Sequence, residues 1–333
     1  MKRKVLVLGA TGNTGAYLTE YLVERLNGAK WEVVAAGRRS TDFFDRYGID
    51  YVQVDISDAR TFESLPDEGV YGIVFLAGLL PAYMDGYHPE DYIRTNSLGA
   101  LNVFEYARRV GADRVLYAQT ISDVLGAVSP EHPLIHPDDA RNIIMTGDHA
   151  VYALSKCLAV DLLRHYRAEY GIKDFVFRLP TVYAYTPDKY WHVNGERRIL
   201  GYRLIMDRAM AGMPLEVWGD PKRSKDVVYV RDFCQLLYKA LVADGVDGGM
   251  YNVGTGVGTT TEDQIKGIAE VFSPKGRECE IVYRPEKPSG PSYLMDIGNA
   301  RSELGYEPEY MYLDYLADFK REMALNRFAD LRG

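Results

Sequence analysis

The sequence predicts an α/β fold: a doubly wound parallel sheet with a smaller C-terminal α/β lobe. Three observations lead to this prediction. Short apolar runs of strand length alternate with segments of helical periodicity through the first half of the chain, as in a parallel sheet covered by helices on both faces. A glycine-rich turn directly follows the first apolar run. From about residue 181 the chain changes to proline-containing loops and shorter elements, which indicates a lobe built on the first domain.

The expected strands are short and almost entirely apolar, because a strand in such a sheet is buried on both faces. In chain order they occupy residues 5–8, 32–36, 51–54, 72–77, 114–118 and 175–178. The expected helices occupy residues 15–26, 92–110 and 152–170, and two later stretches, 227–241 and 261–272, return to a regular pattern. We therefore expect a first domain of residues 1–180, to which elements from about 226–256 return, and a lobe formed mainly by residues 181–333.

Composition and charge describe an ordinary globular protein. The 333 residues include 39 Lys and Arg against 47 Asp and Glu, a formal net charge of −8, and 47% are hydrophobic. Nucleic-acid binding through phosphate neutralisation needs a basic face, so no nucleic-acid partner is expected. No apolar run approaches the ~18–20 residues of a membrane helix, and no membrane partner is expected.

The start of the chain and the cysteines favour a cytoplasmic protein. The apolar residues 5–8 run straight into the glycine turn, without the cleavage-like site of a secretory signal. Cys157, Cys234 and Cys279 are widely spaced and odd in number, which suits a reducing compartment. His132 and His136 stand four apart, but prolines surround them, and we expect no metal site.

The glycine-rich turn lies between the first expected strand and the first expected helix. Its glycines allow a tight turn, let backbone N–H groups approach a pyrophosphate, and permit close packing of the helix on the strand. A simple tight turn is the alternative, but the context favours a dinucleotide site and so a Rossmann sheet. The expected cofactor contacts from this turn are Gly9, Thr11, Gly12, Asn13, Thr14 and Gly15.

The end of the second strand indicates which dinucleotide binds. NAD sites usually carry an acid here for the ribose 2′-hydroxyl, whereas this chain has Arg38 and Arg39. A guanidinium can bind a 2′-phosphate in bidentate fashion, so we expect NADP to be preferred over NAD. A solvated strand end is the alternative interpretation.

Two further strand ends complete the expected cofactor site. Asp55, followed by Ile56, ends the third strand, where an acid can accept a hydrogen bond from the adenine amine. The fourth strand ends with small or apolar residues that would let the cofactor pass, namely Leu76, Ala77 and Gly78.

Tyr152 and Lys156 stand four residues apart, on one face of the expected helix 152–170. A phenol has a pKa near 10, and lowering it by about three units takes ~4 kcal/mol. An adjacent ammonium and the positive nicotinamide of an oxidised cofactor could supply this stabilisation. The spacing alone is common on exposed helices, so its meaning depends on the rest of the pattern.

In combination these motifs resemble the short-chain dehydrogenase/reductase superfamily, and more narrowly its extended branch of NAD(P)-dependent sugar epimerases and dehydratases. The resemblance covers nearly the whole chain. Besides the glycine turn and the Tyr152/Lys156 pair, it rests on the segments 115–120, 178–183, 225–232, 251–256 and 296–306. It implies that residues 1–180 are an NAD(P)-binding Rossmann domain and that the C-terminal lobe binds the substrate.

The resemblance also implies a third catalytic residue, a Ser or Thr at the end of the fifth strand. Counting along the strand gives Thr120, whereas counting back from Val124-Leu125-Gly126 gives Ile121. A one-residue insertion after Thr120 resolves this difference. Thr120 is the expected residue and Ser122 the alternative. Dehydratases of the family carry acids just after this position, and Asp123 lies nearby.

The substrate side departs from the family pattern in three places. Nucleotide-sugar members commonly place an Arg some ten residues before the acid that matches Asp296, whereas residues 286–291 of this chain contain none. Nucleotide-sugar members commonly carry Arg where this chain has Lys225, and Asn where it has Thr181. Lysine holds a phosphate as a point charge without a planar bidentate grip. The resemblance adds Pro180 to the cofactor contacts, and it gives the expected substrate contacts Ser122, Thr181, His192 and Lys225.

The sequence therefore predicts an oxidoreductase that exchanges hydride between NADP or NAD and a hydroxyl or keto carbon of a sugar or nucleotide sugar. One alternative is an NADP-dependent alcohol dehydrogenase or carbonyl reductase acting on a non-nucleotide small molecule. A non-catalytic cofactor-binding scaffold is a further alternative, although such relatives usually lose the Tyr or the Lys.

The two helical patterns 92–110 and 152–170 correspond to the helices with which extended-branch relatives form dimers. Both carry more apolar positions than one stripe facing the sheet requires, which predicts a second buried face and a homodimer. Contacts between helices of the same chain could also explain them. The positions are Tyr92, Leu98, Leu101, Phe104 and Tyr106 in the first, and Leu154, Leu158, Val160, Leu162, Leu163 and Tyr166 in the second.

Overall fold

A computed structural model describes residues 2–26, 28 and 30–331. Its largest element is a seven-stranded sheet in the order β14-β7-β5-β4-β1-β2-β3, in which every neighbouring pair is parallel. The strand order reverses between β1 and β4, and ligands of such sheets bind at that point, beyond the carboxyl ends of the strands. The strands are β1 (Arg3–Leu8), β2 (Trp31–Gly37), β3 (Tyr51–Gln53), β4 (Val70–Phe75), β5 (Arg114–Thr120), β7 (Lys173–Leu179) and β14 (Gly248–Asn252).

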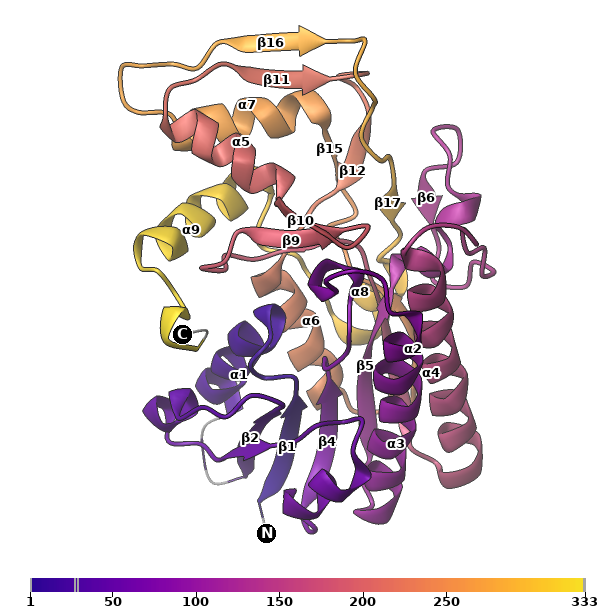
Figure 1. Ribbon diagram of the computed structural model, residues 1–333. Coiled ribbons are helices and arrows are strands. Elements are labelled where there is room, and N and C mark those ends of the chain that lie inside the picture. The colour runs from indigo at the N-terminus through magenta and orange to yellow at the C-terminus, as the bar shows by residue number, and fades with distance from the viewer. Residues whose placement is uncertain (1, 27, 29, 332–333) are drawn as a thin grey trace.

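Helices cover both faces of this sheet, because alternate side chains of each strand point to opposite sides. On β1, Val5 and Val7 join the core beneath α1 and α6, whereas Leu6 and Leu8 join the core beneath α3 and α4. Figure 1 shows α3 and α4 side by side, with α1 and α6 on the other side of the sheet. These helices are α1 (Asn13–Leu26), α3 (Gly99–Arg109), α4 (His149–Tyr170) and α6 (Val230–Val242).

The C-terminal lobe lies beyond the carboxyl ends of the strands (Figure 1). It consists of two-stranded pairings and helices. The pairs are β9 (Tyr190–Val193) with β10 (Glu196–Ile199), β11 (Leu215–Trp218) with β16 (Ile281–Arg284), β12 (Ser224–Asp226) with β15 (Gly258–Thr260), β13 (Val228–Tyr229) with β8 (Val182–Tyr183), and β17 (Leu294–Met295) with β6 (Leu134–Ile135). The helices are α5 (Gly201–Met210), α7 (Thr261–Phe272), α8 (Gly298–Leu304) and α9 (Tyr312–Ala324).

This architecture confirms the expected α/β class, and most elements lie within a few residues of their expected bounds. The expected helix 92–110 is longer and less regular than its pattern indicates. It begins as α2 (Pro89–Tyr92), continues through a π-helical turn (Ile93–Leu98) and ends as α3. The apolar pattern gives no sign of the wider turn, because a π turn adds a residue without changing which residue types are buried. The division at residue 180 stays a prediction.

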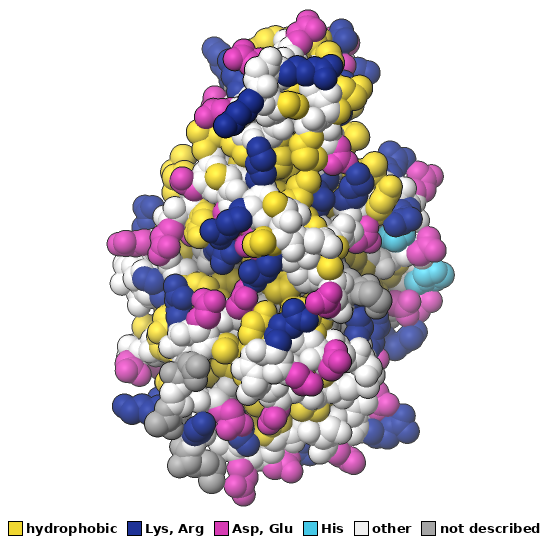
Figure 2. Space-filling view, turned by 90° about the vertical axis from the view of Figure 1, so that its left-hand side faces the viewer, with side chains coloured by type: hydrophobic (Ala, Val, Ile, Leu, Met, Phe, Trp, Pro, Cys, Tyr) yellow, Lys and Arg dark blue, Asp and Glu magenta, His cyan; other side chains and the backbone are white. Residues whose placement is uncertain are grey.

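On the face shown in Figure 2, acidic and basic side chains are interspersed. None of the described helices combines the length and apolar character that crossing a membrane requires.

Candidate active site

The glycine turn joins β1 to α1 at the point where the strand order reverses. Gly9 has φ of +97°, and a Cβ there would lie 2.6 Å from the backbone nitrogen of Ala77. A Cβ on Gly15 would overlap the carbonyl oxygen of Gly9. Since α1 begins at Asn13, its positive end faces the space beyond the strands. The turn therefore has the close backbone approach that a dinucleotide pyrophosphate requires. Thr11 and Gly12 lie in the turn, and Thr14 lies in the first turn of α1.

Arg38 and Arg39 are exposed at the end of β2. Their backbone is fixed from β3, since Gln53 Nε2 donates to the carbonyl oxygen of Arg38 at 3.0 Å and the Tyr51 hydroxyl donates to that of Gly37 at 3.0 Å. In the described part of the chain, neither guanidinium forms an ion pair. The arginines are thus held at the strand end with their charges available to a ligand.

The ends of β3 and β4 lie on either side of the turn. Asp55 Oδ1 accepts hydrogen bonds from the backbone and hydroxyl of Ser57, at 2.9 and 2.7 Å, while Ile56 is buried. After β4 the backbone nitrogens of Leu76 and Ala77 both donate to Leu8, at 2.9 Å each. This pairing holds the end of β4 against the end of β1.

Asn96, in the π-helical turn, ties the end of β4 to α4. Its Oδ1 accepts from the Leu79 nitrogen at 2.8 Å, and its Nδ2 donates to the Leu79 oxygen at 2.9 Å and to Ser155 Oγ at 3.2 Å. A Cβ on Gly78 would lie 3.1 Å from Asn96 Oδ1 and 4.0 Å from Lys156 Nζ. A side chain at position 78 would therefore crowd Asn96 and approach Lys156.

The structure brings Thr120, Ser122 and Tyr152 together. Strand β5 ends at Thr120, and a 3-10 turn follows over Ile121–Asp123. Thr120 Oγ1 donates to Ser122 Oγ at 3.1 Å. Burial raises the pKa of Tyr152 to about 12, and a hydrogen bond with Thr120 opposes that rise. The lowered phenol pKa expected from the sequence also requires a positive nicotinamide, and in the protein alone desolvation sets the direction of the shift.

Lys156 lies one helical turn after Tyr152, and both side chains are only 7% exposed. Burial lowers the pKa of Lys156 to about 7, and the neighbouring Cys157 acts in the opposite direction. Among the described residues, no carboxylate pairs with this ammonium. Its Nζ instead lies 4.2 Å from the centre of the Tyr117 ring. The sequence pattern gave no indication of Tyr117, although it lies on the same strand as Thr120.

Asp123, the acid that follows Ser122, forms a buried ion pair with Arg178. Both carboxylate oxygens accept from Arg178 Nε, at 3.0 and 3.2 Å, and the two side chains are 1% and 2% exposed. Arg178 also donates to the carbonyl oxygen of His136 at 2.8 Å and to Asn252 Oδ1 at 3.2 Å. The carboxylate is thus a buried partner in a network that joins β5, β7 and β14.

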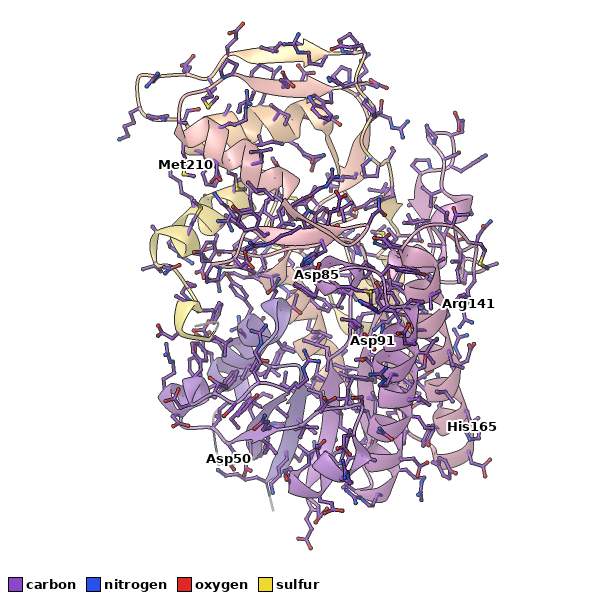
Figure 3. The ribbon with its side chains drawn as sticks, in the orientation of Figure 1. Asp50, Asp85, Asp91, Arg141, His165 and Met210 are labelled. Carbon is purple, nitrogen blue, oxygen red and sulfur yellow. The ribbon has the colours of Figure 1, made fainter. Side chains whose placement is uncertain are left out.

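The expected substrate-contacting residues lie on separate elements of the structure, unlike Thr120, Ser122 and Tyr152. Lys225 Nζ donates to the Tyr183 hydroxyl at 2.7 Å, and burial lowers the pKa of this lysine. Thr181 is exposed just after β7, where Pro180 is buried. His192 lies on β9 of the β9–β10 hairpin, with Nε2 4.0 Å from Asp85 Oδ1. Asp85 is labelled in Figure 3, close to this hairpin.

The hairpin that carries His192 lies over the carboxyl end of the sheet. The backbone nitrogen of Asn194 donates to Asp148, the residue before α4, at 3.0 Å. A second cover comes from the segment after β4, where the Tyr83 hydroxyl accepts from Asn13 Nδ2 at 2.6 Å. The hairpin and this segment therefore close the site from the side of the lobe.

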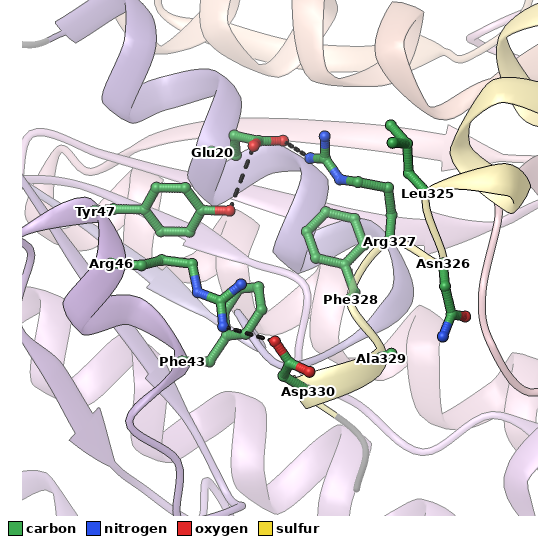
Figure 4. Close-up of a pocket in the computed structure, with 10 residues that line it drawn as sticks. All are labelled: Glu20, Phe43, Arg46, Tyr47, Leu325, Asn326, Arg327, Phe328, Ala329 and Asp330. Carbon is green, nitrogen blue, oxygen red and sulfur yellow. Dashed lines mark hydrogen bonds and ion pairs between the residues drawn. The ribbon is translucent and has the colours of Figure 1, made fainter.

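A separate cavity of about 420 Å³ lies where residues 325–330 cross α1 and the turn at residues 43–47 (Figure 4). Its charged side chains pair with one another: Arg46 binds Asp330 at 3.0 Å, and Arg327 binds Glu20. None of the expected site residues lines this cavity. No group of three or more His, Cys, Asp and Glu side chains among the described residues is arranged to hold a metal ion.

Comparisons with known proteins agree with this geometry. The chain matches the NAD dependent epimerase/dehydratase family over residues 5–254. UDP-glucuronic acid decarboxylase 5 of Arabidopsis thaliana is 27% identical over 312 residues, which cover 92% of this chain and 85% of the relative.

Solved structures share the fold over nearly the full length. The UDP-glucose 4-epimerase of Thermotoga maritima, crystallised with UDP-glucose, superposes with a TM-score of 0.75 at 22% identity and covers 96% of this chain and 99% of its own. The dTDP-glucose 4,6-dehydratase of Bacillus anthracis, in complex with NAD, gives a TM-score of 0.73 at 18% identity, covering 98% and 97%. Together with the match over residues 5–254, these findings show that the chain is an enzyme of the NAD dependent epimerase/dehydratase family, in the extended branch of the short-chain dehydrogenases.

Proposed function

We propose that this enzyme transforms a nucleotide sugar by transient oxidation at a hydroxyl-bearing carbon, as an epimerase or a related dehydratase or decarboxylase. The observation that carries the proposal is the meeting of Thr120, Tyr152 and Lys156 beside a glycine turn suited to a dinucleotide. When bound, the nicotinamide supplies hydride exchange with the substrate carbon.

The roles of the three side chains follow from their chemistry. In the free protein Tyr152 is a neutral phenol, ready to donate a proton to the substrate oxygen. To accept a proton it needs cationic neighbours, and bringing its pKa from about 12 to near 7 takes ~7 kcal/mol. Lys156 contributes its charge to this and can hold a ribose hydroxyl. Thr120 orients the reacting oxygen, and Ser122, to which its hydroxyl donates at 3.1 Å, is the alternative.

The cofactor proposed here is NADP in preference to NAD, because Arg38 and Arg39 offer two guanidiniums at the end of β2 and no acid stands there. Arg38→Ala should weaken NADPH binding about tenfold or more, the scale of a charge-assisted hydrogen bond, and leave NADH binding nearly unchanged. Equal dissociation constants of the native protein for the two cofactors would contradict this preference.

One observation favours a second candidate, a dehydrogenase or carbonyl reductase for a small non-nucleotide alcohol or ketone. The ammonium of Lys225 is hydrogen-bonded to the Tyr183 phenol at 2.7 Å, and burial lowers the pKa of this lysine. A lysine bound in this way grips a diphosphate less firmly than a free arginine does.

A homodimer is proposed from the exposed apolar residues of the two adjacent helical segments. Leu98, Leu154 and Leu158 are 55%, 43% and 46% exposed, whereas Phe104 and Leu163 are buried within the chain. Contacts inside the chain therefore account for only part of the apolar pattern. Light scattering at micromolar concentration tests the dimer: a mass of 37.6 kDa that stays constant on concentrating would refute it.

A product assay tests the function. The native protein and Tyr152→Phe are incubated with NAD or NADP and with UDP-glucose, UDP-glucuronic acid or dTDP-glucose, and the sugars are separated by chromatography. Conversion of a nucleotide sugar by the native protein, but not by Tyr152→Phe, supports the proposal. If nucleotide sugars are unchanged and small alcohols reduce NADP, the second candidate is correct. Absence of turnover with both substrate classes would overturn both.

A further inference from the structure

Lys156 is a buried cation with an unusual electrostatic partner. Its side chain is 7% exposed, and no carboxylate among the described residues lies within ion-pair distance. A buried ammonium normally needs a counter-ion or hydrogen-bond acceptors, because desolvation penalises its charged form. Here Nζ lies 4.2 Å from the centre of the Tyr117 ring, well inside the ~6 Å range of a cation–π interaction.

Tyr117 is itself rigidly held. It is 1% exposed in the middle of β5, with its ring 5.3 Å from that of Phe75 and 6.4 Å from that of Phe104. Its hydroxyl is buried and finds no hydrogen-bond partner among the described residues. The ring face, rather than the hydroxyl, is therefore what this side chain offers to Lys156.

The other groups around the ammonium do not replace the ring. Cys157 and Tyr152 lie on the same helix, and burial raises the pKa of each, so both are neutral at neutral pH. From the end of β4, Gly78 lies near the ammonium, since a Cβ there would be 4.0 Å from Nζ, and it carries no charge. Asn96, whose Oδ1 lies 3.1 Å from the same Cβ position, is also uncharged. Tyr117 thus supplies the one electron-rich face against Nζ in the described part of the chain.

We propose that Tyr117 is a positioning residue, whose ring face holds the Lys156 ammonium toward the cofactor and takes the place of a counter-ion. The inference rests on the proposed role of Lys156 in binding the cofactor ribose. The proposal requires the aromatic ring of Tyr117 for holding the Lys156 ammonium, whereas the hydroxyl of Tyr117 is not required.

The test is the pH dependence of NADH binding, followed by nicotinamide fluorescence. NADH is the probe because the 2′-phosphate of NADPH would itself titrate near pH 6. In the native protein, affinity should fall as the pH rises through the pKa of Lys156. In Tyr117→Met the ammonium loses its partner, so this inflection should move down by about one unit or more, a tenfold change in the proton affinity of Lys156.

Two variants serve as matched controls. Tyr117→Phe keeps the ring and should keep the native inflection, and it should not lower the melting temperature, because it removes an unpaired buried hydroxyl. Phe104→Leu creates a similar packing defect beside Tyr117 without touching Lys156, so its inflection should be native even if its stability falls. Tyr117→Leu is measured in parallel, so that the result does not depend on one variant folding.

Lys156→Met distinguishes the two ways in which the inference can fail. If Lys156→Met abolishes the inflection while Tyr117→Met and Tyr117→Leu leave it at the native pH, the role of Lys156 stands and that of Tyr117 is wrong. An inflection that persists in Lys156→Met would overturn the assignment of Lys156 and, with it, the inference on Tyr117. An equal shift in Phe104→Leu would show that packing alone sets the inflection.

Discussion

Replacing Arg178 by Met should destabilise the protein in a way that depends on pH. The side chain pairs with Asp123 at 3.0 and 3.2 Å, and both residues are at most 2% exposed. Removing one partner of a buried ion pair costs about 3–5 kcal/mol, because the other charge stays buried and uncompensated. The carbonyl oxygen of His136 and Asn252 Oδ1 also lose a donor. Arg178→Met should therefore lie at the upper end of that range at neutral pH.

The pH dependence identifies the charge as the cause. Burial raises the pKa of Asp123, and Arg178 opposes that rise. Without Arg178 the folded-state pKa moves further above the unfolded value of ~3.9. Between the unfolded and the folded pKa of Asp123, the folded state binds more protons than the unfolded state. The free energy of unfolding therefore falls as the pH rises through this range. The loss in free energy of unfolding caused by Arg178→Met should therefore be small near pH 4 and grow toward pH 7.

Urea unfolding followed by circular dichroism measures this deficit at each pH. The double variant Asp123→Leu with Arg178→Met removes both charges, and it should lose much less than the sum of the two single changes. A deficit that is equal at pH 4 and pH 7 would refute the charge argument.

Three further outcomes are expected. Tyr152→Phe should lower turnover by about 10²–10⁴ with nearly native cofactor affinity, and near-normal turnover would mean that the proton moves elsewhere. Gly15→Ala should abolish cofactor binding or folding, because its Cβ would overlap the Gly9 carbonyl; native NADH affinity would contradict this geometry. Tyr83→Phe should speed NADH release measured by stopped flow, since it removes the 2.6 Å hydrogen bond from Asn13, and an unchanged rate would show that this contact does not retain the cofactor.

The sequence alone determined the class of fold and the place of the glycine turn between β1 and α1. A strand of a buried parallel sheet appears in the sequence as a short apolar run. A glycine-rich turn directly after the first such run is typical of a dinucleotide-binding fold. Residues 5–8 and 175–178, expected as strands, lie within β1 and β7. The Tyr152/Lys156 pair was equally local, because four residues along a helix always share a face.

Only the tertiary structure decided which side chains of the site pair with one another and how their pKa values shift. Asp123 is the partner of Arg178, 55 residues away, and no local pattern reveals such a pairing. The same holds for Tyr117, whose ring meets Lys156 from another element of the fold. In the protein alone burial raises the pKa of the Tyr152 phenol, because the exclusion of solvent depends on everything packed around that side chain. Spacing along the chain determines which side chains share an element, whereas their ionisation depends on solvent exclusion and on neighbours that folding brings together.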